Sequence, residues 1–557
     1  MTQNLRLTIP GTKITPAQVM RLSVADSMHL DEASGRLLLV SGRAFLADDL
    51  ADAAPLDADA IWTLYEKQGT EVCEALAGLY TIAVYDAPAG NIYLFQDRFS
   101  GAAPLYFTRV GQGFSADSSL KRLIRQMPAP RALNQAALED FLLYGVLKDE
   151  RTLVKGVMKL PRGKRAVLHL RDQRAAFFPN VYCETAARRP ETFEDYGLAF
   201  REAVRACMGD APPAITLSGG YDSNLILWSM RAMTSEKIKA LTIGGRKGVD
   251  ETETASRAAC GYDGVEVLTG HVDGETLERL PDIVFRLEGS VFESGIFLQY
   301  ELGRLAQSRG VTHLVLGDGA DQMMDVSPRL PWAGLIRRFA PWLSSEDMNA
   351  LVVLKKNALT LTSFGVDCRY PYLEERFLRM ARALRFLNGT GKYYHKHAVS
   401  AIVPDATRAQ LKKVGGSTHV SPLFTGKIDY EHFKRRATAL KYHDPRRKIR
   451  YHKSREESEI EYVLQLMYLH LFEEIFLSGR YDGEMDGPSF DVPLSEFYDG
   501  LPEAQKEAPI HAPRSIRGHQ IYSRLMRLCS RCVYAAYAAK NRGHLLRRAP
   551  THSSSHP

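Results

Sequence analysis

A six-residue loop carries the clearest chemical signal in this sequence. Ser218-Gly-Gly-Tyr-Asp-Ser223 follows the apolar run Ala214–Leu217 and precedes a segment with helical spacing. Glycines let backbone N–H groups approach an anion closely, and a helix N-terminus adds donors and a favourable dipole. The hydroxyls of Ser218 and Ser223 add further donors, whereas Asp222 would repel bare phosphate and therefore suits a bridging Mg²⁺. The loop predicts a site for the phosphates of ATP and a magnesium ion.

The elements that must position this loop alternate between strand and helix. Strands are expected at 214–217, 238–243, 264–268 and 313–316, and helices at 193–208, 223–233, 252–259 and 295–308. Such alternation is typical of a parallel sheet covered by helices on both faces. Residues 326–477 are expected to be mainly helical.

The first 115 residues follow a different rhythm, in which strands dominate. Strands are expected at 37–40, 79–85 and 91–95, with a hairpin turn at 86–90 and a helix at 57–76. After a strand-like segment at 166–170, the polar and basic stretch 171–192 is expected to be a linker. Because 557 residues exceed one ordinary core, at least two domains are expected.

Five segments together resemble the asparagine synthetase family of N-type ATP pyrophosphatases. They follow the family's order across about residues 195–425 and are Ser218–Ser223, Asp250-Glu251 with Ala255, Leu316–Gln322, Gly365–Leu373 and Gly391–Lys396. The resemblance implies a class II glutamine amidotransferase-like sandwich at 1–185 (an α+β domain). It also implies an α/β domain at 190–505, with a doubly wound parallel sheet similar to adenine nucleotide α-hydrolases and a large helical part. Residues 506–557 would form a basic tail.

The resemblance also implies roles for individual residues. ATP would be bound by Leu217, Ser218, Gly219, Gly220, Tyr221, Asp222, Ser223, Thr242, Ile243 and Gly317. Asp222 and Asp321 would hold Mg²⁺, because hard divalent cations choose carboxylate oxygens. Lys392 and a later lysine would neutralise charge on the departing pyrophosphate. Spacing to a following glycine favours Lys413 for the later lysine, with Lys412 as the alternative.

The N-terminal part resembles the glutamine amidotransferase domain of the same family. The matching segments are Gly78–Asp86, Asp97-Arg98 and Pro104–Tyr106. In the family this domain releases ammonia with an N-terminal cysteine, whereas here position 2 is Thr2 and the first cysteine is Cys73. Ser41-Gly42-Arg43 stands where the glutamine-binding triplet Asn-Gly-Glu is usual. We therefore expect an inactive scaffold domain and a substrate that carries its own amine.

Two branches of the family act on such substrates, the β-lactam synthetases and the macrocyclases of lasso peptides. β-Lactam synthetases place a tyrosine where this chain has Asp318, and a partnering glutamate where it has Asp367. Two carboxylates could accept a proton from an ammonium group, with a metal or turn-capping role as the alternative for Asp318. The missing tyrosine counts against β-lactam formation. The helical C-terminal half and the basic tail fit a large peptide substrate better than a small amino acid, which favours the lasso peptide cyclases.

In that reaction ATP adenylates an Asp or Glu side chain of a precursor peptide, and the peptide's N-terminal amine attacks it. The products are a macrolactam, AMP and pyrophosphate. The expected partners are the precursor peptide, a leader peptidase and a leader-recognition protein. A ligase acting on a small amino acid or on free ammonia, and a protein without catalytic activity, are alternatives.

The formal charge of +7 is unevenly placed, because no acidic residue follows position 507. The basic tail is either a solvated segment or a docking surface for an acidic partner. A tRNA-modifying enzyme is a further alternative, since related pyrophosphate loops occur there. The basic residues lack clear interleaved aromatic stacking platforms, however, and the motifs follow the synthetase order, so no nucleic-acid partner is expected.

Cysteine usage and hydropathy bear on the compartment. The seven cysteines are odd in number and scattered, which suits reduced thiols. The N-terminus has no apolar segment typical of a secretory signal, and no apolar run is long enough to span a bilayer. A cytoplasmic location is therefore expected.

Overall fold

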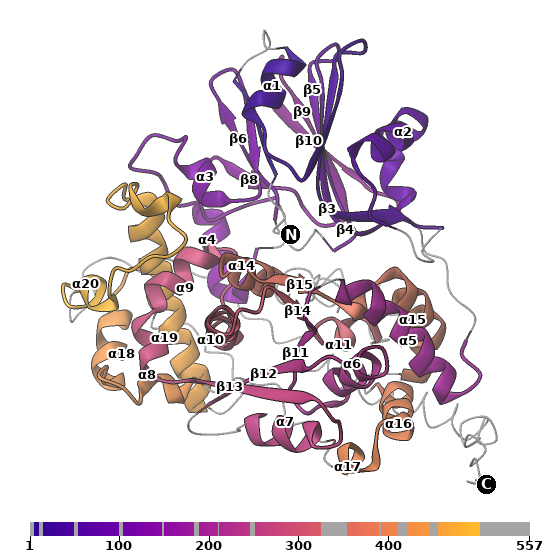
Figure 1. The fold of residues 1–557 in the computed structure, drawn as a ribbon. Helices are drawn as coiled ribbons and strands as arrows, with labels where there is room; N and C mark the ends of the chain where they lie inside the picture. Colours follow the sequence, from indigo (N-terminus) through magenta and orange to yellow (C-terminus); the bar gives the residue numbers. More distant parts are fainter. Residues whose placement is uncertain are drawn as a thin grey trace.

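The chain folds into two parts, a β-sandwich followed by a parallel sheet covered with helices (Figure 1). The computed structural model describes residues 5–10, 15–48, 54–99, 104–147, 150–182, 189–209, 211–245, 251–324, 354–388, 392–409, 411, 420–444 and 455–501. The first part is built from antiparallel strands and the second from parallel strands. This confirms the fold class expected from the sequence.

The sandwich consists of two antiparallel sheets, with strand orders β1-β7-β6-β8 and β10-β9-β5-β4-β3-β2. The strands are β1 (Arg6–Ile9), β2 (Ser27–Asp31), β3 (Arg36–Leu46), β4 (Leu76–Asp86), β5 (Asn91–Gln96), β6 (Tyr106–Val110), β7 (Gly113–Asp117), β8 (Val157–Lys159), β9 (Lys164–His169) and β10 (Arg174–Pro179). Successive residues of a strand face opposite sides. Leu37 and Leu39 accordingly join the core between the sheets, whereas Leu38 and Val40 pack under a helix on the outer face.

That helix is α2 (Ala58–Gln68), and it ends earlier than the expected helix 57–76. Asp57 begins it by accepting a hydrogen bond from the backbone N–H of Ala60. Gly69, with φ of +57°, ends it, and a 3-10 turn leads directly into β4. The remaining helices of this part are α1 (Pro16–Leu22), α3 (Leu120–Ile124) and α4 (Gln135–Tyr144).

The expected linker at 171–192 is wrong in its first half. Residues Arg174–Pro179 form β10, which pairs antiparallel with β9 at the edge of the larger sheet. Its residues are half-buried or exposed, although Ala175–Phe178 is a short apolar run, because β10 lies at the edge of the sheet. The pairing partner, rather than hydrophobicity, makes this segment a strand.

The second part is built on five parallel strands in the order β13-β12-β11-β14-β15. They are β11 (Ala214–Thr216), β12 (Ile238–Gly245), β13 (Val265–Val272), β14 (His313–Val315) and β15 (Asp367–Arg369). Ile215 and Ala240 face one hydrophobic core, whereas Ala214 and Leu241 face another, so both faces of the sheet are covered. Strand order reverses on either side of β11, and ligands bind at the carboxyl ends of strands at such a switch point.

The helices of the second part are α5 (Phe193–Met208), α6 (Tyr221–Arg231), α7 (Glu251–Ala259), α8 (Gly274–Glu278), α9 (Leu280–Leu287), α10 (Gly295–Ser308), α11 (Ala320–Met324), α14 (Lys355–Ser363), α15 (Glu375–Asn388), α16 (Tyr393–Ile402), α17 (Asp405–Arg408), α18 (Tyr430–Thr438), α19 (Arg455–Phe472) and α20 (Leu494–Tyr498). The helices expected at 193–208 and 295–308 are confirmed to the residue. The segment expected to be mainly helical also contains the strand β15, which adds an edge to the sheet.

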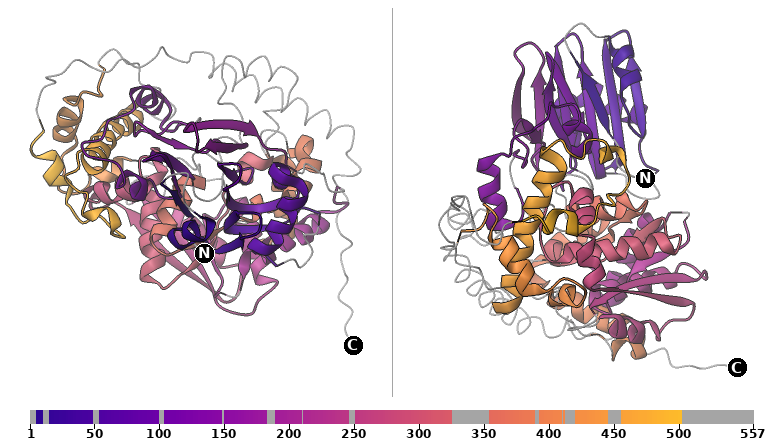
Figure 2. Two further views of the ribbon diagram at one scale, coloured as in Figure 1. Left: turned by 90° about the horizontal axis from the view of Figure 1, so that it is seen from above. Right: turned by 90° about the vertical axis from the view of Figure 1, so that its left-hand side faces the viewer.

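The sandwich lies against one side of the helix-covered sheet (Figure 2), and one hydrophobic core contains residues of both parts. Phe141 of α4 stacks on Tyr468 of α19, with 5.9 Å between ring centroids. Glu288 accepts hydrogen bonds from Ser119 Oγ (2.6 Å) and from the backbone N–H of Leu120 (2.7 Å). None of the helices in the described ranges is both long and apolar enough to cross a bilayer.

Candidate active site

The loop after β11 has a shape that only glycine can give it. Gly219 has a φ of +75°, a conformation that residues with a side chain rarely adopt. A Cβ atom at this position would lie 2.7 Å from Thr254 Cγ2 of α7 and 2.8 Å from the Thr254 carbonyl oxygen. The close approach to α7 and the positive φ together explain the glycine.

The donors of the loop are held only weakly by the protein itself. The backbone N–H of Gly220 donates to Ser218 Oγ across 3.4 Å, and the two hydroxyls of Ser218 and Ser223 lie 3.3 Å apart. Gly220 is the N-cap of α6, and no side chain caps the helix there. Long contacts and an uncapped helix N-terminus leave this loop able to bind an anion.

Asp222, Asp321 and Lys392 meet beside the loop. The Lys392 ammonium lies 2.7 and 2.6 Å from the two carboxylate oxygens of Asp222 and 2.7 Å from Asp321 Oδ1. Burial alone would raise the pKa of Asp222, but Lys392 and His395 together hold that pKa below its usual range. Burial likewise lowers the pKa of Lys392, and the two carboxylates more than reverse that effect. At neutral pH Asp222 and Lys392 therefore form a charged pair.

Two residues that the sequence analysis did not single out, His395 and Tyr196, form a chain of polar contacts to Asp222. His395 is fully buried; its Nε2 lies 2.9 Å from Asp222 Oδ1, and its Nδ1 lies 2.6 Å from the Tyr196 hydroxyl. Burial lowers the pKa of His395, which favours the neutral ring. The signal was a histidine within Gly391–Lys396 where the family motif has an apolar residue.

The expected ATP-binding residues surround one cavity of about 340 Å³, a volume typical of ligand sites. Its lining includes Leu217, Ser218, Gly220, Tyr221, Asp222, Ser223, Thr242, Ile243, Gly317, Asp318, Asp321 and Lys392. Gly219 lies behind the loop, against α7. We call this space the nucleotide cavity below.

Asp318 lies in the nucleotide cavity within a buried group of polar residues. Asn357 Nδ2 donates to Asp318 Oδ2 across 2.8 Å, and Lys356 Nζ lies 2.6 Å from Glu293 Oε1. Burial raises the pKa of Asp318, and the charge of Lys356 and the Asn357 hydrogen bond oppose that rise. Asn357, Lys356 and Glu293 were not singled out from the sequence, because they lie in segments without a motif.

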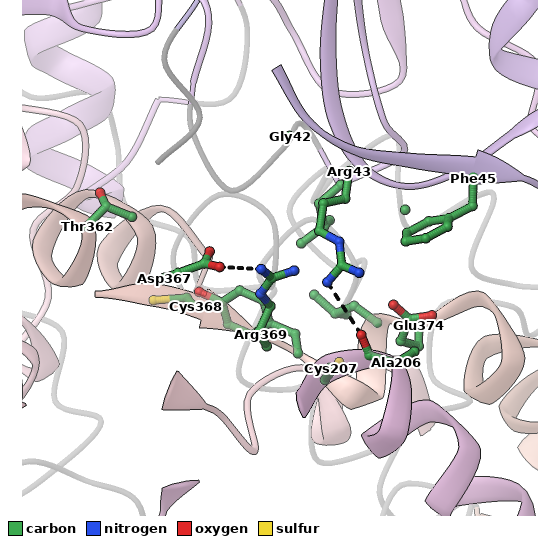
Figure 3. Close-up of a pocket in the computed structure, with 14 residues that line it drawn as sticks. Gly42, Arg43, Phe45, Ala206, Cys207, Thr362, Asp367, Cys368, Arg369 and Glu374 are labelled. Carbon is green, nitrogen blue, oxygen red and sulfur yellow. Dashed lines mark hydrogen bonds and ion pairs between the residues drawn. The ribbon is translucent and has the colours of Figure 1, made fainter. Parts of the chain in front are cut away.

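Asp367 does not lie in the nucleotide cavity. It lines a separate cavity between the two parts of the chain, where it forms an ion pair with Arg369 (Figure 3). His313 Nε2 lies 3.3 Å from the same carboxylate. The structure therefore does not bring Asp367 and Asp318 together at one reaction centre. Lys412 and Lys413 lie outside the described residues.

Asp222 and Asp321 offer the carboxylate oxygens that Mg²⁺ prefers as ligands. The carboxylates of Asp222 and Asp321 are close enough to contact one ammonium nitrogen, so both could reach a single small cation. Among the described residues no group of three or more metal-ligating side chains occurs. Mg²⁺ typically takes one or two protein carboxylates and completes its shell with water and phosphate oxygens, which fits this pair.

Comparison with known proteins supports the class that the fold and loop define. Residues 196–362 match the asparagine synthase family, and residues 46–179 match the glutamine amidotransferase domain. Together with the sandwich and the phosphate loop, these matches support an asparagine synthase-like chain with an amidotransferase-like first part.

Individual relatives are similar at low identity. A Mycobacterium tuberculosis protein named provisionally as a glutamine-hydrolysing asparagine synthetase is 25% identical over 335 residues, covering 54% of this chain and 51% of the relative. Asparagine synthetase B of Escherichia coli is 21% identical over 354 residues, covering 58% of this chain and 57% of the relative. The chain thus spans about half the length of these relatives.

Proposed function

We propose that this chain is an ATP-dependent, AMP-forming carbon–nitrogen ligase that activates a carboxylate as an adenylate. The proposal is supported above all by the cluster of Lys392, Asp222 and Asp321 beside the loop Ser218–Ser223. Transfer of the adenylyl group needs positive charge and backbone donors around the departing pyrophosphate, and this end of the cavity offers both.

In this proposal the residues of the chain act by binding and charge compensation. The N-terminus of α6 and the hydroxyls of Ser218 and Ser223 hold the phosphates, and Lys392 moves from the carboxylates to the pyrophosphate. Mg²⁺ bound at Asp222 and Asp321 would neutralise charge on the phosphate oxygens. The substrate carboxylate oxygen forms a bond to the α-phosphorus while the bond to pyrophosphate breaks.

We further propose that the acceptor is the N-terminal amine of the same peptide whose Asp or Glu side chain is activated, as in lasso peptide cyclases. The amine nitrogen bonds to the acyl carbon, a proton passes to Asp318, and AMP leaves as the macrolactam forms. Asp318 supports this proposal because it is a half-buried carboxylate that lines the nucleotide cavity, and partial desolvation raises its pKa. The precursor peptide, a leader peptidase and a leader-recognition protein would be the partners.

The amidotransferase-like part supports an acceptor other than glutamine-derived ammonia. Ser41-Gly42-Arg43 lies in β3, and the Arg43 guanidinium points across to the second part, where Nη1 donates to the Ala206 carbonyl. A guanidinium at this position carries the charge opposite to that of the glutamate usual in the family triplet. A second candidate, a ligase that joins ammonia to a small amino acid, is favoured by the names of the relatives.

The test measures pyrophosphate release and product mass with the full chain, ATP and Mg²⁺. Linear peptides with an N-terminal glycine and an internal Asp or Glu are compared with aspartate plus ammonium. We expect pyrophosphate release and loss of one water from a peptide. Turnover of aspartate and ammonium alone would replace the peptide assignment with the second candidate, and release with no substrate of either kind would contradict the ligase.

Variants separate the metal assignment from the overall reaction. Asp222→Ala and Asp321→Ala should each abolish pyrophosphate release, because the cation would lose half of its protein ligands. Asp405→Ala is the matched control, since Asp405 is highly exposed and pairs with the exposed Arg408. Unchanged release in either of the first two variants would show that the metal assignment is wrong.

A further inference from the structure

A second cavity lies between the two parts of the chain, away from the nucleotide cavity. Figure 3 shows its lining, which comes from β3 and β4 on one side and from α5, α14 and β15 on the other. It shares no lining residue with the nucleotide cavity. Its volume of about 80 Å³, against about 340 Å³, suits a small molecule rather than a nucleotide.

Arg43 enters this interdomain cavity from the sandwich. β3 pairs with β4 here, and the two backbones approach so closely that a Cβ at Gly78 would lie 2.2 Å from the Arg43 carbonyl oxygen. The guanidinium makes a long 3.4 Å hydrogen bond to the Ala206 carbonyl and lies 5.3 Å from the centre of the Phe45 ring. Within the described parts of the chain, no carboxylate lies within ion-pair distance of Arg43.

Arg369 enters the same cavity from β15, opposite Arg43 (Figure 3). The Arg369 Nη2 group donates to the Asp367 carboxylate. The Nε atom of Arg369 is buried and has no hydrogen-bond partner among the described residues. Burial first, and then the positive charge of Arg369, lower the pKa of Arg43. Two guanidinium groups therefore lie in one partly desolvated space, and Asp367 pairs with Arg369 on the side away from Arg43 (Figure 3).

Glu374 is the other acidic residue of the lining. Burial raises its pKa, and the positive charges of Arg376, Arg43 and Arg369 oppose that rise. Arg43 is half-buried, and the charges of Glu374 and Asp367 act on it from beyond ion-pair distance, so its desolvation is only partly offset. The remaining lining is largely apolar and includes Phe45, Ala206 and Leu373.

We propose that the interdomain cavity binds a small carboxylate-bearing molecule, with its carboxylate between Arg43 and Arg369 and a short apolar tail against Phe45 and Leu373. Guanidinium groups match a planar carboxylate through paired N–H donors, and such charge-assisted bonds are strong in a partly buried site. The proposal goes beyond the ligase reaction, because the site is separate from the nucleotide cavity. It gives the unusual Arg43 of the sandwich a ligand-binding role.

Titration calorimetry on the full chain tests this proposal. The probes are acetate, propionate, L-alanine and L-glutamate, with acetamide as a neutral analogue and inorganic phosphate as a competing anion. We expect at least one carboxylate to bind, with acetamide and phosphate failing to bind. Saturating ATP should leave the affinity unchanged. No carboxylate binding, binding of phosphate alone, or competition by ATP would overturn the proposal.

Variants place the bound molecule in the cavity. Arg43→Gln should weaken binding by about tenfold or more, because a charge-assisted hydrogen bond is lost, whereas Arg43→Lys should keep part of the affinity. Arg174→Gln, at an exposed position of β10, is the matched control and should bind as the original chain does. Ala206→Leu narrows the cavity without changing any charge and should also weaken binding. Equal affinity in Arg43→Gln and Arg174→Gln, or in Ala206→Leu and the original chain, would contradict the site.

Discussion

Lys392 shows how single residues at the nucleotide cavity are held in unfavourable states. Its φ of +54° places a side-chain-bearing residue in the left-handed region, which costs about 1–2 kcal/mol. Its ammonium is also nearly buried, and a buried charge must be paired. Contacts with both Asp222 and Asp321 meet that requirement. The same backbone conformation places the Lys392 ammonium group beside the loop Ser218–Ser223.

A change of Lys356 to methionine tests whether Asp318 accepts the proton of the amine. The charge of Lys356 opposes the burial that raises the pKa of Asp318, so Lys356→Met should raise that pKa further. Asp318 would then be protonated at higher pH and unable to act as a base. The acid limb of kcat/KM for amide formation should therefore move to higher pH. The measurement is a pH–rate profile.

The control for this change is Lys237→Met, because Lys237 is exposed and pairs with Glu266 on the surface. It should leave the acid limb in place. An unmoved acid limb in Lys356→Met, or a shift to lower pH, would remove Asp318 from the proton transfer.

The site residues could be predicted from the sequence where the motif and the topology agree. Asp222 follows β11 and Asp321 follows β14, and the carboxyl ends of neighbouring parallel strands meet. The motif does not predict where Asp367 lies, because this residue is within β15 and its position along the motif does not say which face of the strand the side chain takes. Asp367 and Arg369 are two residues apart, so they share a face and form an ion pair there.

At the scale of elements, the phosphate loop depends on its packing against α7. Gly219→Ala should destabilise the fold, because the added methyl group meets Thr254 and the positive φ is strained. Overpacking of this kind costs about 1–3 kcal/mol. We also expect ATP affinity to fall by about tenfold, since a shift of the loop misplaces its N–H groups. Urea unfolding and ATP titration calorimetry measure the two effects.

Gly209→Ala provides a matched control for this substitution. Gly209 has a similar φ of +62°, but nothing lies within 4 Å of the position that a Cβ would occupy. The expected result is a loss of about 1 kcal/mol of stability from backbone strain, with ATP affinity unchanged. Equal ATP affinity in Gly219→Ala and Gly209→Ala would separate the loop from nucleotide binding.

Helices and strands could be predicted from the sequence where their own residues supply capping groups or a regular spacing of apolar side chains. α5 has a Thr192 capping box and an apolar stripe, and its bounds follow from these local features. β10 has no comparable local signal. It is an edge strand of half-buried and exposed residues, and its structure depends on pairing with β9. α2 ends at Gly69 although helical spacing continues, because Leu76 begins a strand that the sheet requires.

At the scale of the whole molecule, the contact between the two parts could not be predicted from the sequence. Phe141 and Tyr468 are far apart in the chain, and each reads only as an apolar helix residue. Glu288 reads as an ordinary acidic residue, yet it accepts two hydrogen bonds from the first turn of α3. Burial raises the pKa of Glu288, which marks it as part of an interior rather than of a surface.

Arg131 joins the two parts more firmly than any surface ion pair would. Its guanidinium donates to Asp482 Oδ1 at 2.6 Å and Oδ2 at 3.0 Å, and also to the carbonyls of Ile124 and Phe476. Its side chain is 1% exposed, whereas that of Asp482 is 39% exposed. Removal of the guanidinium would leave buried carbonyl acceptors without donors.

Arg131→Met should therefore lower the free energy of unfolding by about 3 kcal/mol, as expected for loss of a buried hydrogen-bond network. Arg125→Met is the matched control, because Arg125 also joins the two parts, through Asp486, with both side chains largely exposed. An exposed pair contributes about 0–1 kcal/mol, so this variant should unfold close to the original chain. Urea unfolding followed by circular dichroism gives both values. If the two variants lose equal stability, the parts are held together by their shared apolar core, and the buried guanidinium adds nothing to it.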